Sequence, residues 1–425
     1  MMQWEKYSRD MISSRVAMAI DHNVNYHTDA VLGFPGTHLD AEDYYADGSS
    51  VITRIPWESP LLDDEPYLRA IIENPNHIGC HTAERSETGF PGTQELEREA
   101  LAICAEEIMY ADRLGYDGYI SPGGTECNLE ACWMYRNLFR RAFGARPDEV
   151  GLVFSADTHY SVWKASNLLD LRPFAIPIDD ASRVMSKEAI AATLDAVQAA
   201  GIRFVIAVVN MATTMFGSVD EPLPLISSLW QRRLEFRLHV DGAYGGFIYP
   251  FAVSEHSLDF RNPDVSSITM DAHKMLKAPY GTGIFLCRKG LIDEVCTSEA
   301  SYVHGKDYTI CGSRSGANAV AVWMLLRDAG SEGLTARCRR LLARTSTFCA
   351  QLDRLGVSYY RHPAMNQVAI RSAYIKPSLA DKYLLVPDTH DAEPRWWKIV
   401  LMDHVRESLL DCFLNDLESE LKRQR

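Results

Sequence analysis

The sequence predicts an α/β protein with a mostly parallel, doubly wound sheet of seven strands and a small C-terminal α+β domain. Between residues 117 and 288, short apolar runs alternate with helix-length segments, and this pattern changes after residue 311. Nearly continuous apolar strands are typical of a parallel sheet with both faces covered. At 425 residues the chain also exceeds the usual size of one hydrophobic core, so a large and a smaller domain are expected.

Three regions follow one another along the chain. Residues 1–65 are polar, rich in Asp, Tyr and His, and are interpreted as an N-terminal arm. Helical periodicity begins at about residue 66 and is clearest at 96–114. We therefore expect a large domain over 66–310 and a small C-terminal domain over 311–425.

Seven apolar runs are predicted to form the strands of the large domain. The last two are too close for a crossover helix, so this pair is expected to be antiparallel. In the small domain, two helical stretches come first, followed by strands in 367–372 and 396–405 and a final helix. The seven runs lie at 119–122, 151–156, 174–178, 203–210, 236–243, 266–272 and 282–287.

Composition narrows the class of protein. The 47% of hydrophobic and 24% of charged residues are ordinary for a globular domain, and the net charge of −14 disfavours nucleic acid or an anionic membrane as partner. The ten cysteines include no C-x-x-C pair, which favours reduced thiols in the cytoplasm. The N-terminus lacks the apolar core of a secretory signal, and no run approaches the roughly 18 apolar residues of a membrane span.

Two strand ends carry groups that suit a phosphorylated, aromatic ligand. Gly123, Gly124 and Thr125 follow a strand and open a helix, whose N-terminus offers free N–H groups to a phosphate. A plain glycine turn with a threonine cap is the ordinary alternative. His159 ends another strand, where an imidazole can stack on a ring or cap the next helix.

Asp241 ends an apolar strand, where an unpaired carboxylate is costly to bury. A protonated pyridinium nitrogen would compensate it, as would an Arg or a helix N-terminus, and the small Gly242 and Ala243 leave room for a flat ring. A metal site is disfavoured, because only His239 is near and strand alternation turns it to the opposite face.

Lys274 lies just past the next apolar strand. An amine at this point can form a Schiff base with an aldehyde cofactor, although a solvated lysine is commoner and Lys277 competes for the role. Together, these strand ends supply the groups that bind pyridoxal 5'-phosphate (PLP). They are a binding site for the phosphate, a histidine that stacks on the ring, an aspartate for the ring nitrogen and a lysine for the aldehyde.

In their residues and in their order along the chain, these motifs resemble those of the group II PLP-dependent amino-acid decarboxylases, over about residues 70–420. The short tyrosine/aspartate decarboxylases and bacterial histidine decarboxylases are most similar, and sphingosine-phosphate lyase is a near relative. The resemblance implies the aspartate-aminotransferase-like fold (fold type I). It is carried by FPGTQELE (90–97), SPGGTECN (121–128), DTHYSVWK (157–164), ATTMFGSVD (212–220), HVDGAYGGF (239–247), MDAHKM (270–275), TICGSRSGANAVAVW (309–323) and KIVLMDHV (398–405).

The resemblance also implies a role for individual residues. Lys274 would form the internal aldimine with His273 beside it, Asp241 would pair with the pyridinium nitrogen, and His159 and Ala243 would pack on the two faces of the ring. Tyr302 would deliver the proton that replaces carbon dioxide. The remaining contacts would be Gly124, Thr125 and Ser313 to the phosphate, Thr213 near the ring's phenolic oxygen, and His81 on the substrate side.

The expected reaction is α-decarboxylation of an L-amino acid, with an aromatic one such as tyrosine first and aspartate or histidine next, in a homodimer with the active site at the subunit interface. Carbon–carbon lysis of the sphingosine-phosphate lyase type is an alternative, as is a non-catalytic PLP-binding or regulatory protein. The chain departs from the family at Gly242, where an alanine is usual, and at Asp271, where many decarboxylases have Asn or Ser. An anionic Asp271 beside a phosphate would be unfavourable unless it is protonated or turned away.

Overall fold

The computed structural model describes residues 2–24, 43–44, 50–51, 76–78, 89–297 and 305–424. Its main sheet contains seven strands, and each predicted apolar run overlaps one of them to within a few residues. The strands are β4 (Tyr116–Ser121), β5 (Val150–Ser155), β6 (Arg172–Ile176), β7 (Phe204–Asn210), β8 (Glu235–Gly242), β9 (Val265–Asp271) and β10 (Gly283–Arg288).

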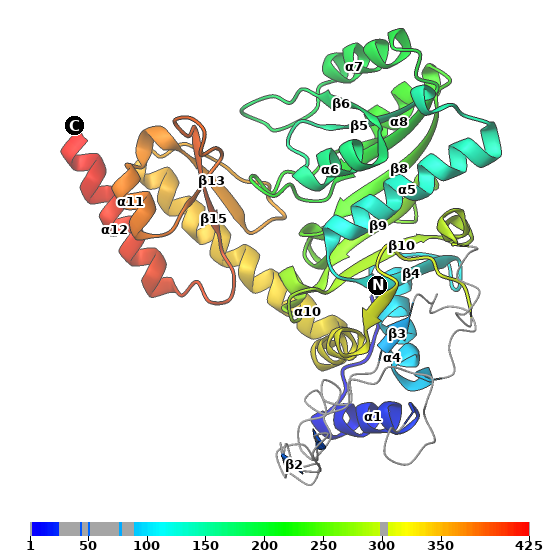
Figure 1. The fold of residues 1–425 in the computed structure, drawn as a ribbon. Coiled ribbons are helices and arrows are strands. Elements are labelled where there is room, and N and C mark those ends of the chain that lie inside the picture. Colours follow the sequence, from blue (N-terminus) through cyan, green and yellow to red (C-terminus); the bar gives the residue numbers. More distant parts are fainter. Residues whose placement is uncertain are drawn as a thin grey trace. The chain divides into compact units, whose positions relative to one another are not determined.

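The strand order is β4-β10-β9-β8-β7-β5-β6 (Figure 1). The pairs β5–β6, β5–β7, β7–β8 and β8–β9 are parallel, whereas β10 is antiparallel to β4. The predicted fold class, an α/β protein with a mostly parallel seven-stranded sheet, is therefore confirmed.

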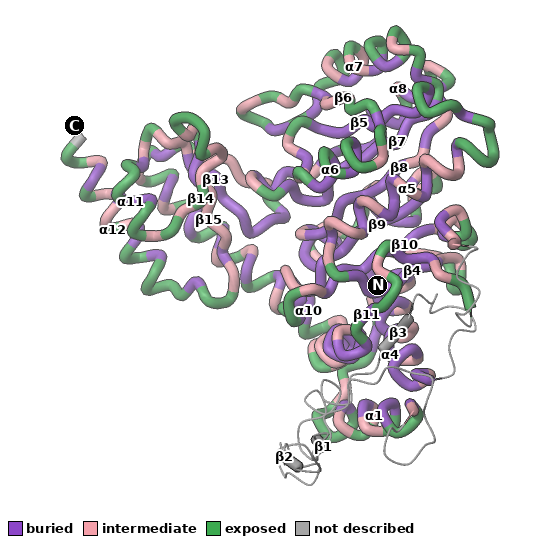
Figure 2. The backbone as a smooth tube through the Cα atoms, in the orientation of Figure 1, coloured by how far each residue is buried: buried purple, intermediate pink, exposed green. Residues whose placement is uncertain are grey.

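The central strands are buried along their whole length. Every residue of β5, β7 and β9 is buried (Figure 2). Because neighbouring residues of a strand point to opposite faces, this pattern means that both faces of the sheet are covered.

The helices between these strands are α5 (Gly124–Phe143), α6 (Tyr160–Leu169), α7 (Lys187–Ala199), α8 (Pro222–Gln231) and the short α9 (Tyr249–Ala252). Their ends follow local chemistry. The Ser186 side chain caps α7 by accepting from the N–H of Ala189, and α8 begins with Pro222, whose missing N–H costs nothing in a first turn.

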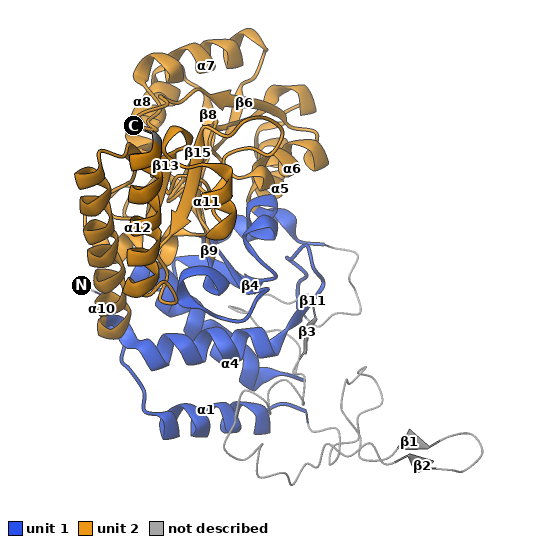
Figure 3. Cartoon of the chain, turned by 90° about the vertical axis from the view of Figure 1, so that its left-hand side faces the viewer, with its two compact units in different colours: residues 1–130, 271–331 blue, residues 131–270, 332–425 orange. Residues whose placement is uncertain are grey.

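The chain divides into two compact units, coloured separately in Figure 3. Unit 1 comprises Met1–Glu130 and Asp271–Ser331, and unit 2 comprises Ala131–Met270 and Glu332–Arg425. Each unit combines two separate segments of the chain, whereas the domains predicted at 1–65, 66–310 and 311–425 are continuous. The units therefore do not test those domain boundaries, which remain a prediction.

Unit 1 contains a helix that the sequence analysis did not predict, α1 (Arg9–Asp21), within the stretch interpreted as an arm. It contacts α4 (Pro91–Ala102), and the two are so close that a Cβ on Gly92 would lie 1.8 Å from the backbone oxygen of Ala19. The helical pattern expected over 96–114 is α4 continued by a π-helix, η1 (Ile103–Ile108). Three short strands, β1 (Asp43–Tyr44), β2 (Ser50–Val51) and β3 (Asn76–Ile78), pair as β1–β2 and β3–β11 (Ser313–Ser315).

The C-terminal part begins with α10 (Gly316–Leu355), which contains the non-helical Gly330 (φ 62°, ψ 171°) and is thus two helices joined by a kink, as expected. In unit 2 a four-stranded antiparallel sheet follows, with the order β12-β13-β15-β14. Phe348, Ile370 and Leu417 belong to its core. The elements are β12 (Tyr359–Tyr360), β13 (Gln367–Arg371), α11 (Pro377–Lys382), β14 (Val386–Pro387), β15 (Trp396–Val400) and α12 (Glu407–Gln424).

Nine cysteines lie in the described ranges, and six of them are buried. Cys412 is exposed, and burial raises the pKa of Cys132 and of Cys338 to about 12. None of the helices in the described part of the chain has the length and apolar content needed to cross a membrane. The buried thiols are Cys104, Cys127, Cys132, Cys287, Cys338 and Cys349.

Candidate active site

The predicted phosphate seat lies in unit 1, where β4 ends and α5 begins. Gly123 has a φ of +150°, which favours glycine, and its N–H donates to Ser121 Oγ at 3.1 Å. Within the described ranges, the N–H groups of Gly124 and Thr125 have no recorded hydrogen-bond partner. Two free donors at the N-terminus of a 20-residue helix form a suitable seat for an anion.

Lys274 lies on a π-helix, η4 (Ala272–Leu276), that follows β9. Its Nζ is 2.9 Å from Oδ2 of Asp271, the last residue of the strand. The Asp271 side chain is 3% exposed and that of Lys274 is 33% exposed. The amine at the tip of the lysine therefore contacts a buried carboxylate, while the lysine side chain is partly accessible. π-Helical turns are frequent at functional sites.

His273 completes this group. Its Nε2 is 3.5 Å from the same Asp271 oxygen, and its Nδ1 accepts a hydrogen bond from the N–H of Thr282 at 3.3 Å. Lys277, the competing lysine, is exposed and lies beyond the π-helix with a φ of +65°. Lys274 thus has an ion pair with a buried carboxylate, while Lys277 is exposed.

Asp241 lies in unit 2 at the end of β8 and is 6% exposed. Its Oδ1 accepts a hydrogen bond from the N–H of Ala243 at 3.1 Å, which holds the carboxylate over the turn that follows the strand. Ala243 is itself buried.

His239 has a structural environment. It is fully buried, its Nδ1 is 2.6 Å from Ser267 Oγ, and its Nε2 is 3.1 Å from Thr269 Oγ1. Burial lowers the pKa of His239 to about 4, so the imidazole is neutral at physiological pH. Among the described residues there is no group of three or more His, Cys, Asp and Glu that could hold a metal ion.

His159 caps α6, which was the ordinary alternative for this residue. Its Nδ1 accepts from the N–H of Ser161 at 3.2 Å and lies 2.9 Å from Ser161 Oγ. The cap fixes the imidazole at the carboxyl end of β5. Capping and stacking do not exclude one another, and the stacking role remains a prediction.

Thr213 closes a tight turn between β7 and α8. Ala212 before it has a φ of +78°, and Thr213 Oγ1 lies 2.7 Å from Ser218 Oγ. Gly217 is required for close packing in this turn, because a Cβ there would lie 2.5 Å from Gln367 Oε1 of the C-terminal sheet. The turn is thus held against β13 within unit 2.

A buried polar network that the sequence analysis missed joins several of these strand ends. The Asn210 side-chain amide, at the end of β7, donates to Thr158 Oγ1 at 2.8 Å and to Asp220 Oδ2 at 2.6 Å. The Asn210 N–H also donates to Asp220 Oδ2, at 2.8 Å. The network connects the residue before His159 to the turn that holds Thr213. A polar residue ending the apolar run at 203–210 was the signal that could have found it.

Arg183 is a second missed residue. It is 5% exposed, donates to both carboxylate oxygens of Asp157 at 2.6 and 2.9 Å, and places its guanidinium 3.6 Å from the Phe216 ring centroid. Its own φ is +57°, which is unfavourable for an arginine. Arg183 therefore joins the DTHYSVWK turn to the ATTMFGSVD turn. Nothing in its polar sequence surroundings indicated such a role.

The GSR motif is anchored in unit 1 by a buried ion pair. Arg314 pairs with Glu97 from the FPGTQELE segment and also donates to the backbone oxygen of Ile120 at 3.0 Å. The Ile120 N–H donates to Glu97 Oε1 at 2.7 Å. The pair thus ties two of the recognised motifs to β4, while the neighbouring Ser313 is exposed. Tyr302 and His81 lie outside the described residues.

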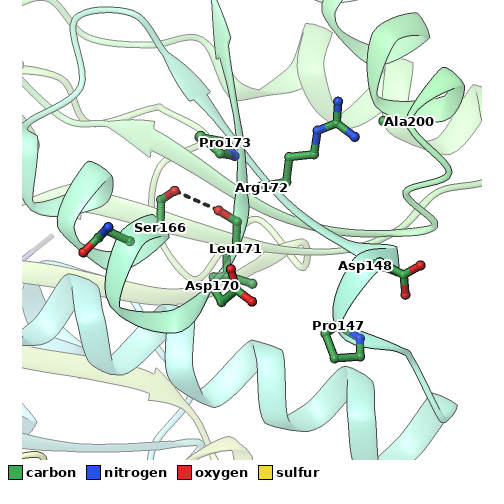
Figure 4. A pocket seen from close by; sticks show the side chains of 9 residues that line it. Pro147, Asp148, Ser166, Asp170, Leu171, Arg172, Pro173 and Ala200 are labelled. Atoms are coloured by element: carbon green, nitrogen blue, oxygen red, sulfur yellow. Dashed lines mark hydrogen bonds between the residues drawn. The ribbon is translucent and has the colours of Figure 1, made fainter.

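A surface pocket in unit 2 lies away from these strand ends (Figure 4). Its lining includes residues that precede β5, residues from the ends of α6 and α7, and the first residues of β6, so it lies at the amino ends of those strands. In α/β sheets ligands bind at the carboxyl ends. The lining residues are Pro147, Asp148, Ser166, Asn167, Asp170, Leu171, Arg172, Pro173 and Ala200.

Comparison with known proteins gives concordant matches. Residues 76–359 match the family model described as the pyridoxal-dependent decarboxylase conserved domain. The chain is 41% identical over 415 residues to the tryptophan decarboxylase of Clostridium sporogenes, covering 97% of each chain. It is 31% identical to a probable L-tyrosine/L-aspartate decarboxylase of Methanothrix thermoacetophila, covering 78% of this chain and 82% of that protein.

A solved structure extends the likeness to the fold. The L-methionine decarboxylase of Streptomyces sp. 590 superimposes with a TM-score of 0.71 at 19% identity, covering 96% of this chain and 93% of that chain. At this identity the likeness concerns the fold alone.

Proposed function

We propose, from the premise that this chain belongs to the pyridoxal-dependent decarboxylase family, that its substrate is an aromatic L-amino acid. Decarboxylation of an amino acid with PLP as cofactor is the activity of the family, and the motifs had predicted it. The tryptophan decarboxylase at 41% identity over nearly the whole chain supports the aromatic class and moves tryptophan ahead of tyrosine, the first expectation. Aspartate and histidine rank below them.

The described residues fit PLP. Gly124 and Thr125 present N–H groups without partners at a helix N-terminus, which suits the phosphate. Lys274 is a partly exposed amine at the end of β9, which suits the aldehyde, and Asp241 is a buried carboxylate at the end of β8, which suits a protonated ring nitrogen. When bound, PLP supplies an electron sink for the bond that loses carbon dioxide.

The observation that carries the assignment of the cofactor lysine is the position of Lys274, paired with Asp271 directly after β9, while Lys277 is exposed beyond the turn. The further assignments are proposals on the family pattern. His159 and Ala243 would flank the ring, and Thr213 would lie near its phenolic oxygen. Ser313 would help to hold the phosphate, and His273 would lie beside Lys274. Tyr302 is proposed to return a proton to the product, and His81 to contact the substrate.

We also propose a homodimer with the active site at the subunit interface, located in the cytoplasm. The exposed position of Ser313, a proposed phosphate contact, supports a role for a second subunit. The burial of six of the described cysteines supports a reducing compartment, because burial raises the pKa of thiols such as Cys132 and keeps them protonated.

The proposed substrate is tested by measuring carbon dioxide release from each of the twenty amino acids, with the purified enzyme and added PLP. Tryptophan is expected to give the highest kcat/KM and tyrosine the next. Release from aspartate alone would refute the aromatic class. An aldehyde product without carbon dioxide would favour the lyase type, and bound PLP without any turnover would favour a regulatory protein.

A matched pair of variants tests the lysine. Lys274→Ala is expected to abolish both turnover and the absorbance band at about 420 nm, which arises from the cofactor bonded to the lysine. Lys277→Ala is expected to retain both. Loss of the band in Lys277→Ala instead would overturn the assignment.

A further inference from the structure

Asp271 is a buried carboxylate next to the proposed cofactor lysine. Its side chain is 3% exposed, Oδ2 faces Lys274 Nζ at 2.9 Å, and Oδ1 is buried without a hydrogen-bond partner among the described residues. The sequence raised the question of how an aspartate is tolerated here. The structure shows that the carboxylate is directed at the lysine.

The surroundings of Asp271 make this pairing necessary. Cys127 is close enough for Asp271 to contribute to the raised pKa of its thiol, for which burial is the main cause. A thiol cannot compensate a carboxylate charge as an ammonium does. An isolated buried carboxylate is strongly unfavourable, and so Lys274 stabilises Asp271 as much as Asp271 holds Lys274.

His273 orients the carboxylate from the other side. Because its Nδ1 accepts from the N–H of Thr282, a neutral imidazole carries its proton on Nε2, which faces Asp271 Oδ2 at 3.5 Å. Thr282 thus donates to His273, and both His273 Nε2 and Lys274 Nζ face the accepting Oδ2 of Asp271. The imidazole therefore gives the carboxylate a second neighbour besides the lysine.

We propose that Asp271 is a positioning residue for Lys274, and that its carboxylate holds Nζ at the end of β9 whenever this amine is not bonded to the cofactor. The proposal rests on the proposed role of Lys274. The Asn or Ser of similar decarboxylases can accept a hydrogen bond but carries no charge. Aspartate thus holds the displaced lysine by an ion pair and lowers the reactivity of its amine until the pair is broken.

The test measures the reactivity of Lys274 in the full-length chain after removal of the cofactor with hydroxylamine. A trace of acetic anhydride acylates only unprotonated amines, and mass spectrometry of one digest quantifies Lys274 and Lys277 together. Asp271→Asn is expected to raise acetylation of Lys274 at neutral pH by about tenfold, because the amine is no longer held against a carboxylate. Exposed Lys277 is the internal reference and should not change.

Two further variants separate charge from shape. Asp271→Ser should raise the labelling of Lys274 as Asp271→Asn does, whereas Asp271→Glu retains the charge and should keep it closer to the wild type. Protection of the buried thiol Cys287 shows that each variant is folded. Unchanged Lys274 labelling in folded Asn and Ser variants overturns the proposal, as does equal labelling in the Glu and Asn variants.

Failure of this inference is distinguishable from failure of the proposed function. The labelling uses the chain without its cofactor and does not depend on turnover. A wild-type enzyme that releases no carbon dioxide refutes the function and leaves the pair intact. Unchanged labelling in the variants refutes the pair and leaves decarboxylation intact.

Discussion

Replacing Asp220 with asparagine is expected to change how the stability of the folded protein depends on pH. Asp220 is 4% exposed, and burial raises the pKa of its carboxyl from 3.8 to about 6, with smaller contributions from Asp157 and Asp241. The hydrogen bonds from Asn210 oppose this rise without cancelling it. At neutral pH the network thus contains a charge that the folded state tolerates less well than the unfolded state does.

The size and sign follow from proton linkage. Between pH 3.8 and about 6 the folded state binds more protons at Asp220 than the unfolded state, so stability falls as pH rises through this window. At about 1.4 kcal/mol per pH unit, the full loss is roughly 3 kcal/mol and is reached above the folded pKa. Asparagine removes this loss, but its buried amide N–H groups lack partners, which costs about 1–2 kcal/mol at every pH.

The expected result is a crossover. Asp220→Asn should be less stable than the wild type by about 1–2 kcal/mol near pH 4 and more stable by about 1–2 kcal/mol above pH 7. Urea denaturation of both cofactor-free proteins at closely spaced pH values measures the difference, in which the contributions of other carboxyl groups cancel. A difference that is constant with pH would refute the reasoning, because it would mean that Asp220 titrates alike in the folded and unfolded chains.

Three other substitutions test the buried contacts. Arg183→Ala should lower the free energy of unfolding by about 3–5 kcal/mol, since it leaves Asp157 buried without its cation, and an unchanged thermal midpoint would contradict this. Glu97→Ala should cost a similar amount, whereas adding Arg314→Met should restore part of the loss; a double variant no better than the single one would disprove the coupling. Gly245→Ala places a Cβ 2.0 Å from a backbone oxygen, so it should fold poorly or lose more than about 3 kcal/mol in urea denaturation, and wild-type stability would count against the packing described.

The strands could be predicted from the sequence because a buried parallel strand is marked by its own apolar residues. Their ends are less accurate where polar residues are buried by distant partners. β4 begins at Tyr116, three residues before the predicted run, since Asp117 is satisfied by the Lys289 ammonium at 2.6 Å and by the Gly290 N–H at 2.6 Å. Neither partner is near in sequence, so no local pattern indicates them.

Two kinds of helix were missed or placed inaccurately. α1 was missed because the exposed Met11 and Met18 reduce the contrast between its apolar and polar faces. It is also stabilised by contact with α4, which only the folded chain provides. The π-helices η1 and η4 have no periodic sequence pattern of their own. The helical periodicity expected to continue to residue 114 therefore ends at Ile108.

For the candidate site, the residues at strand ends could be identified singly, but their partners could not. Lys274 was chosen over Lys277 because it comes directly after a strand, and their exposures agree with that choice. The charge of Asp271 had no explanation until its distance to Nζ was known. Arg183 lies far in sequence from Phe216, so its contact depends on the tertiary fold.

The buried thiols also make the protein a reporter of its own unfolding. Three of them, Cys104, Cys127 and Cys287, belong to one unit, while Cys132, Cys338 and Cys349 belong to the other. A thiol reagent added in pulses during denaturation would modify each peptide only after its surroundings open, because a buried, protonated thiol does not react. The order in which the six peptides become modified would therefore time the opening of each unit separately, without any engineered probe.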